Sequence, residues 1–248
     1  MDEARSLGPP PPLAELQAQG PLALFFDFDG TLVDIAPTPD AIRVQPGLGA
    51  GLEALAARHG NRLALITGRS LADIHAHMGR PHIAMAGSHG IERQTMSGEV
   101  LGASPAALPD GALAEIGQFV AGTPGLSLEE KDFGAAVHYR QAPALGAMVA
   151  AEAERIADTH GLVVKHGKCV TEFVRPGADK AGAVDAFMAK ERFAGSLPVF
   201  IGDDLTDEDA FAAAERNGGF GIIVGSRSPT AARFKLHDPA AVHEWLGL

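Results

Sequence analysis

Residues 22–31 read Leu22-Ala23-Leu24-Phe25-Phe26-Asp27-Phe28-Asp29-Gly30-Thr31. Five apolar residues, enough for a buried strand, end at two carboxylates. Residues i and i+2 of an extended chain point the same way, so Asp27 and Asp29 can face one site while Phe28 turns into the core. Open α/β sheets bind ligands at this end of a strand. An isolated Asp-x-Asp is more often a solvated acidic turn, so the interpretation depends on the rest of the chain.

Further apolar runs of strand length alternate with segments of helical periodicity. This alternation predicts an α/β protein whose core is a doubly wound, Rossmann-like parallel sheet. The predicted strands are Leu22–Phe26, Arg62–Ile66, His82–Ala86, Pro198–Ile201 and Phe220–Val224. The predicted helices are Leu48–His59, Leu71–Met78, Lys180–Arg192 and Asp207–Glu215.

The pattern changes between Pro105 and Pro176, where two pairs of extended segments flank the helical stretch Leu145–Thr159. Turns are expected at Asp132-Phe133-Gly134 and His166-Gly167-Lys168, since glycine supplies the backbone freedom of a tight hairpin. We therefore expect a smaller α+β domain inserted into the core. The expected divisions are a flexible leader at 1–20, a core at 21–104 and 175–248, and a cap at 105–174.

Two more polar clusters follow predicted strands, at Thr67-Gly68-Arg69-Ser70 and at residues 202–209. Thr67 offers a hydroxyl to a phosphate, although it could instead cap the helix that follows. Asp207 could be an ordinary acid at a helix N-terminus, and Lys180 an ordinary surface lysine. However, several carboxylates at the sheet edge that carries Asp27 would repel one another without a cation among them. Hard oxygen ligands completed by water and phosphate suit Mg²⁺.

With these clusters in order, the chain resembles the haloacid-dehalogenase superfamily of phosphotransferases. The matching motifs are Asp27-Phe28-Asp29-Gly30-Thr31, Thr67, Lys180 and Gly202-Asp203-Asp204-Leu205-Thr206-Asp207. The resemblance implies a phosphatase in which Asp27 is the nucleophile and Asp29 the general acid and base. Thr67 and Lys180 would hold the oxygens of the transferred phosphoryl group.

The same resemblance implies a magnesium cofactor. Its ligands would be the Asp27 carboxylate, the backbone carbonyl of Asp29 and the Asp203 carboxylate. Asp204 and Asp207 would lie next to these ligands and orient them without binding the metal directly. Positioning and charge neutralisation are what phosphoryl transfer mainly needs, so the implied scheme is chemically coherent.

A closer resemblance, to trehalose-6-phosphate phosphatases, spans nearly all of the chain after Pro21. It rests on Gly87-Ser88-His89-Gly90, Glu129-Glu130-Lys131, His138-Tyr139-Arg140, Gly167-Lys168 through Glu172, Arg175-Pro176-Gly177 with Lys180, and residues 202–208. The sugar-binding positions it implies are Glu129, Lys131, Arg140, Lys168 and Glu172, together with His89. Cys169, Thr171 and the Lys180-Ala181-Gly182 sequence depart from the family pattern. None of these departures touches an implied catalytic group.

The extended segments of the insert also alternate in polarity by themselves. Glu129 and Lys131 face one way and Leu128 the other, and His138 and Arg140 share a face. This pattern alone is normal for a half-exposed antiparallel sheet with solvated charges. The interpretation as a sugar platform depends on the catalytic core.

Composition limits the partners. A formal net charge of −11 gives no general attraction for nucleic acid or an anionic membrane, so we expect neither as a partner. No stretch approaches the ~18 apolar residues of a membrane span. A lone cysteine, Cys169, suits a reducing compartment. We therefore expect a cytoplasmic protein, a monomer, acting on a small-molecule sugar phosphate.

Three alternatives stay open at this point. A phosphomutase of the same superfamily would return the phosphoryl group to sugar instead of to water. Spacing does not distinguish trehalose-6-phosphate from sucrose-6-phosphate. A phospho-acceptor receiver module also clusters Asp, Thr and Lys, but its order of motifs and its lack of a large insert disfavour it.

Overall fold

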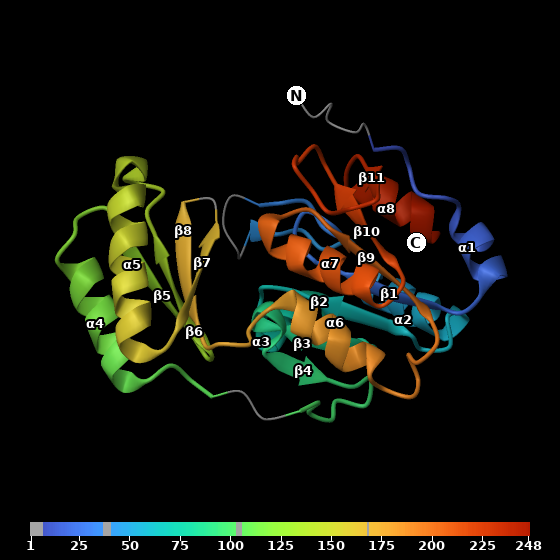
Figure 1. Cartoon of the computed structure of the whole chain (residues 1–248), viewed down its shortest axis with the longest axis horizontal. Helices are drawn as coiled ribbons and strands as arrows, with labels where there is room; N and C mark the ends of the chain where they lie inside the picture. Colours follow the sequence, from blue (N-terminus) through green and yellow to red (C-terminus); the bar gives the residue numbers. More distant parts are fainter. Residues whose placement is uncertain (1–6, 37–40, 103–105, 168) are drawn as a thin grey trace. The chain divides into compact units, whose positions relative to one another are not determined.

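The computed structural model describes residues 7–36, 41–102, 106–167 and 169–248. The chain folds into two compact units, which we call the core unit and the cap unit (Figure 1). The core unit comprises Met1–Ala103 with Asp179–Leu248, and the cap unit is Ser104–Ala178. The insertion expected at 105–174 lies within the cap unit.

The core unit is built on a seven-stranded sheet of order β11-β10-β9-β1-β2-β3-β4. Its strands are β1 (Leu22–Phe26), β2 (Leu63–Ile66), β3 (Ala84–Gly87), β4 (Glu92–Gln94), β9 (Leu197–Gly202), β10 (Phe220–Val224) and β11 (Phe234–Leu236). Every neighbouring pair is parallel except β3 with β4. The predicted doubly wound sheet is therefore confirmed. The two short edge strands β4 and β11 were not predicted, because three residues give no recognisable apolar run.

Alternation along β1 distributes its side chains between two apolar layers. Leu22, Leu24 and Phe26 pack on one face with residues of α1 (Leu13–Gln19), α2 (Leu48–Arg58), α3 (Leu71–Met78) and α8 (Pro239–Leu246). Ala23 and Phe25 pack on the other face, against α6 (Lys180–Met188) and α7 (Glu208–Arg216) (Figure 1). Helices on both faces explain why all five residues of β1 are buried.

Three helices of the core differ from the prediction at their ends, and α2 differs only in ending at Arg58 instead of His59. Helix α6 ends at Met188 instead of Arg192, because the following turn returns the ring of Phe193 to the core, where it stacks on Phe25 at 5.8 Å. Helix α7 begins at Glu208 and follows a 3₁₀ turn over Leu205–Asp207.

The described part of the expected leader forms helix α1 and contacts the core unit. Leu16 of α1 is buried in the core. The Trp245 indole N–H donates to the carbonyl of Pro11 at 2.8 Å, and the backbone N–H of Lys235 donates to the carbonyl of Gly8 at 3.0 Å. The polar composition of the segment concealed the few apolar residues that attach it to the C-terminal helix.

The cap unit is a four-stranded antiparallel sheet of order β5-β6-β8-β7, covered on one face by α4 and α5 (Figure 1). Its elements are α4 (Asp110–Ala121), β5 (Ser127–Lys131), β6 (Gly134–His138), α5 (Gly146–His160), β7 (Val163–Gly167) and β8 (Val170–Val174). Helix α4 was not predicted, since Gly111 and Gly117 dilute its apolar period. Among the helices of the described residues, none is long and apolar enough to cross a membrane.

Candidate active site

Three adjacent parallel strands bring the predicted catalytic residues to one edge of the central sheet. Asp27 follows β1, Thr67 follows β2 and Asp203 follows β9, and β1 lies between the other two. The backbone N–H of Asp27 donates to the carbonyl of Ile201 at 2.9 Å, so the ladder continues to the first carboxylate. The sheet itself thus fixes where the Asp27 side chain starts.

Lys180 lies at the centre of a buried acidic cluster. Its Nζ is 2.9 Å from Asp27 Oδ1 and 2.6 Å from Asp207 Oδ1, and all three side chains are less than a tenth exposed. Carboxylate oxygens of Asp27, Asp203 and Asp207 lie within 4.8 Å of one another. Lys180 is therefore a buried ion-pair partner and not a surface lysine.

Burial and crowding set the protonation of this cluster. Burial raises the pKa of Asp27 well above its usual value, and Asp207 and Asp203 add repulsion that the attraction of Lys180 only partly offsets. Burial and then repulsion from Asp207 raise the pKa of Asp203 to about 7. Burial by itself lowers the pKa of Lys180, but the carboxylates of Asp207 and Asp27 outweigh it and raise that pKa. The cluster carries more negative charge than Lys180 neutralises.

Both carboxylate oxygens of Asp207 accept hydrogen bonds from other groups of the protein. Oδ1 accepts from Lys180, and Oδ2 accepts from the backbone N–H groups of Asp203 and Asp204, both at 2.9 Å. The Asp204 side chain in turn accepts from the backbone of Asp207, which completes a capping box around the 3₁₀ turn. Asp207 therefore fixes the loop that carries Asp203, while the Asp204 residue itself is exposed.

Asp203 is held by the first loop of the chain. The Thr31 hydroxyl donates to Asp203 Oδ1 at 3.3 Å. Gly30 has φ +76°, and a Cβ there would collide with the Asp203 carboxylate, so the position requires glycine. Thr31 was part of the quoted motif, but sequence reasoning gave it no role.

Arg69 holds the carboxylate of Asp29. Its Nε donates to Asp29 Oδ2 at 2.6 Å and its Nη2 donates to Oδ1 at 2.8 Å, while Nη1 reaches Asp73 Oδ2. Arg69 was overlooked as a site residue, although it stands two positions after Thr67 in a cluster that the sequence singled out. Asp29 thus lies apart from the lysine cluster, in a separate ion pair.

Thr67 is buried, and its Oγ1 accepts from the backbone N–H of Arg69 at 3.2 Å. Ser70, not Thr67, caps α3 by accepting from the N–H of Asp73. The helix-cap alternative for Thr67 is therefore excluded. His89 donates its backbone N–H to the Thr67 carbonyl at 3.0 Å and adopts a left-handed conformation with φ 56°. The predicted substrate residue His89 thus lies beside the Thr67 loop in the core unit.

The cap unit collects charged side chains on the sheet face opposite its helices, which we call the polar face. Paired registers place Glu129, Ala136, Glu172 and Lys165 in one row across the four strands. Lys131 Nζ lies 2.5 Å from Glu172 Oε1. Arg140 falls in a turn beyond the end of β6, and Lys168 lies outside the described residues. Three of the five expected sugar-binding residues of the cap, Glu129, Lys131 and Glu172, therefore share one surface.

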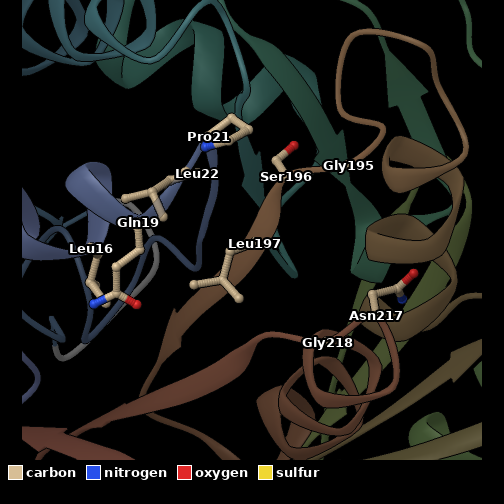
Figure 2. Close-up of a pocket in the computed structure, with 10 residues that line it drawn as sticks. Leu16, Gln19, Pro21, Leu22, Gly195, Ser196, Leu197, Asn217 and Gly218 are labelled. Atoms are coloured by element: carbon tan, nitrogen blue, oxygen red, sulfur yellow. The ribbon is translucent and has the colours of Figure 1, made fainter.

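A cavity of about 440 Å³ lies at the opposite edge of the core sheet (Figure 2). Its lining includes Leu16, Pro21, Leu197 and Asn217, at the amino ends of β1 and β9. None of the described residues that line this cavity is charged. It lacks the groups that would neutralise a phosphate, so the acidic edge is the candidate active site.

Comparisons with known proteins agree with this geometry. Residues 25–240 match the family model for trehalose-phosphatase. A trehalose-6-phosphate phosphatase from Escherichia coli is 38% identical over 227 residues, covering 90% of this chain and 85% of that protein.

Solved structures show the same fold. The C-terminal domain of a Candida albicans trehalose-6-phosphate phosphatase superposes with a TM-score of 0.80 at 22% identity, over 98% of this chain and 97% of that one. A haloacid dehalogenase-like hydrolase from Bacteroides thetaiotaomicron gives a TM-score of 0.65 at 17% identity, over 91% and 98%. The core has the haloacid-dehalogenase fold, and the chain belongs to the trehalose-phosphatase family.

Proposed function

We propose that this chain hydrolyses trehalose-6-phosphate to trehalose and inorganic phosphate through an aspartyl-phosphate on Asp27. The observation that carries the proposal is the buried contact of Asp27 with Lys180 at the edge where the Thr67 and Asp203 loops meet. Membership of the trehalose-phosphatase family supports the same substrate and reaction.

In the first step an oxygen of Asp27 attacks phosphorus, and the bond from phosphorus to the sugar oxygen breaks. Lys180 offsets the negative charge of the phosphoryl oxygens, and Lys180 and the Thr67 hydroxyl together orient them. Charge neutralisation and positioning are the main requirements of phosphoryl transfer. Asp29 donates a proton to the departing sugar oxygen, so the leaving group is a neutral alcohol.

In the second step Asp29 takes a proton from water, whose oxygen attacks phosphorus. The bond to Asp27 breaks, which releases phosphate and restores the carboxylate. Both Asp29 oxygens accept from Arg69 in the structure, so Asp29 must exchange one of these bonds for a bond to the leaving oxygen or to water. Arg69 thereby sets the position from which Asp29 acts.

The acidic edge suits a divalent cation. Hard carboxylate oxygens, a surplus of negative charge and the raised pKa of Asp203 fit Mg²⁺. The carboxylates of Asp27 and Asp203 and the backbone carbonyl of Asp29 would hold it, whereas both oxygens of Asp207 are already occupied. When bound, Mg²⁺ supplies positive charge against the phosphoryl oxygens.

The polar face of the cap unit would recognise the sugar. A neutral disaccharide offers many hydroxyls, and carboxylates and ammonium groups on strands can accept from and donate to several of them. A site of this kind rejects an analogue that leaves its polar groups unpaired. We therefore assign sugar binding to Glu129, Lys131, Arg140, Lys168 and Glu172 of the cap unit and to His89 of the core unit. We expect preference for trehalose-6-phosphate over glucose-6-phosphate.

Three expectations from composition stay predictions. The cytoplasm suits a chain with one cysteine and a phosphorylated substrate. The net charge of −11 argues against nucleic acid as a partner. We also keep the monomer as the expected state.

Phosphate release from a panel of sugar phosphates, measured with and without Mg²⁺, tests the proposal. We expect release from trehalose-6-phosphate, no turnover in excess chelator, and recovery when Mg²⁺ is restored. Release of inorganic phosphate also excludes a phosphomutase. Full activity in chelator would remove the metal from the scheme, and preference for glucose-6-phosphate or sucrose-6-phosphate would overturn the assignment of substrate.

A further inference from the structure

The cap unit contains two histidine–glutamate pairs of the same geometry. His138 Nε2 lies 2.7 Å from Glu129 Oε2, and His160 Nε2 lies 2.7 Å from Glu115 Oε2. An ionised carboxylate only accepts hydrogen bonds, so the imidazole Nε2 donates in both pairs. The two pairs therefore share their geometry but differ in location, and Glu115 also accepts from Arg155 Nη2 at 2.7 Å.

The two histidine–glutamate pairs lie on opposite sides of the cap sheet. His138 ends β6 and Glu129 lies on β5, diagonally across the hairpin, and both side chains are on the polar face. The buried small residues Gly134 and Ala136 lie on the same face. The longer charged side chains therefore project beyond their small neighbours on the polar face. His160 and Glu115 instead join α5 to α4, in the helical layer that covers the opposite face.

On the polar face, His138 restrains the Glu129 carboxylate and leaves it partly exposed. The hydrogen bond from His138 comes first among the causes that lower the pKa of Glu129, and Lys131 adds to it. Glu129 is thus an ionised acceptor with one oxygen fixed by His138 and a side chain 41% exposed. Glu172, across Ala136 in the same row, is restrained in a similar way by Lys131. Each carboxylate of this row has a donor that sets its orientation.

We propose that His138 is a positioning residue for substrate selection, which holds Glu129 in the orientation that accepts hydroxyls of the sugar. This inference rests on the proposed function. A fixed carboxylate loses less conformational freedom when the sugar binds, so the hydrogen bond contributes to affinity although His138 itself touches no sugar. The effect should fall on KM for the sugar phosphate, since the interaction is made before and throughout the reaction.

Three variants separate positioning from general support of the fold. In His138→Ala we expect KM for trehalose-6-phosphate to rise by roughly ten-fold, the scale of one hydrogen bond to a charged group. The matched control His160→Ala loses an equal bond in the helical layer and should keep the wild-type KM. His138→Gln, whose amide N–H can replace the imidazole donor, should recover most of the loss. Equal constants for His138→Ala and His160→Ala, or no recovery in His138→Gln, would overturn the inference.

A double-mutant cycle with Glu129→Ala tests whether His138 acts through Glu129. If it does, removing His138 in the Glu129→Ala background should change KM no further. Additive losses would show that His138 contacts the sugar itself and would refute the positioning role. Hydrolysis of p-nitrophenyl phosphate, which has no sugar, should fall far less than that of trehalose-6-phosphate in His138→Ala. Failure of the wild type on trehalose-6-phosphate would instead contradict the proposed function, so the two failures are distinguishable.

Discussion

The charged cluster of the core unit and that of the cap unit are built on opposite principles. Around Lys180 the side chains of Asp27 and Asp207 are 8% and 0% exposed, and carboxylates outnumber the lysine. On the polar face Lys131 and Glu172 are 26% and 18% exposed, and His138 and Glu129 are 24% and 41%. There each carboxylate has its own donor.

The difference in burial and balance indicates a division of labour. A buried cluster with an excess of negative charge interacts strongly with a charged ligand, because little water screens it. Phosphoryl transfer with a bound cation requires such strong interactions. Partly exposed pairs of balanced charge keep their polar atoms available to a neutral partner and interact weakly with one another. The core should therefore determine the rate of chemistry on any phosphate ester, and the cap should determine which ester is favoured.

The largest effect should come from removing the nucleophile. Asp27→Asn keeps the size of the side chain but replaces the attacking oxygen by an amide, so we expect turnover to fall by on the order of 10⁶-fold, as for other nucleophiles. Both trehalose-6-phosphate and p-nitrophenyl phosphate should be affected, and covalent labelling by phosphate should vanish. Near-normal phosphate release from this variant would require a different nucleophile.

The next effect should come from removing the buried cation. Lys180→Met leaves Asp27 and Asp207 without their partner, and breaking a buried ion pair from one side costs roughly 3–5 kcal/mol of unfolding free energy. Urea denaturation should record that loss, and phosphate release should fall on the order of 10²-fold or more as a phosphoryl contact disappears. Lys180→Arg, which keeps the charge, serves as the control. An unchanged unfolding free energy in Lys180→Met would contradict the contacts described here.

A smaller effect is expected at Arg69. Arg69→Gln removes the two hydrogen bonds that orient Asp29, so turnover should fall by about ten-fold to a hundred-fold, less than the ~10²–10⁴ expected for Asp29→Asn. Steady-state rates of the two single variants and of the double variant would show whether Arg69 works through Asp29. Independent, additive losses would place Arg69 outside the acid–base step.

The sequence was sufficient for the five longer strands of the core sheet and for the residues attached directly to them. Asp27 and Asp203 follow neighbouring strands, and the carboxyl ends of parallel strands meet at one edge, so their convergence could be predicted. The pairing of Arg69 with Asp29 could not, because it depends on the rotamer of a long side chain 40 residues away. The alternation of the sequence predicted which face of its strand His138 occupies. Its diagonal contact with Glu129 could not be predicted, because it depends on the strand register. Helix α1 was missed because its burial depends on Trp245 and α8, at the far end of the chain.

The most direct test of this division of labour measures kcat/KM of Glu172→Ala on two substrates. Glu115→Ala, which removes an ion-paired carboxylate from the helical layer of the same unit, is the matched control. We predict that Glu172→Ala lowers kcat/KM for trehalose-6-phosphate by roughly ten-fold to a hundred-fold more than for p-nitrophenyl phosphate, because the sugar's polar contacts are lost only from the former. Glu115→Ala should leave the ratio of the two values unchanged. Equal losses on both substrates in Glu172→Ala would contradict the assignment of substrate choice to the cap.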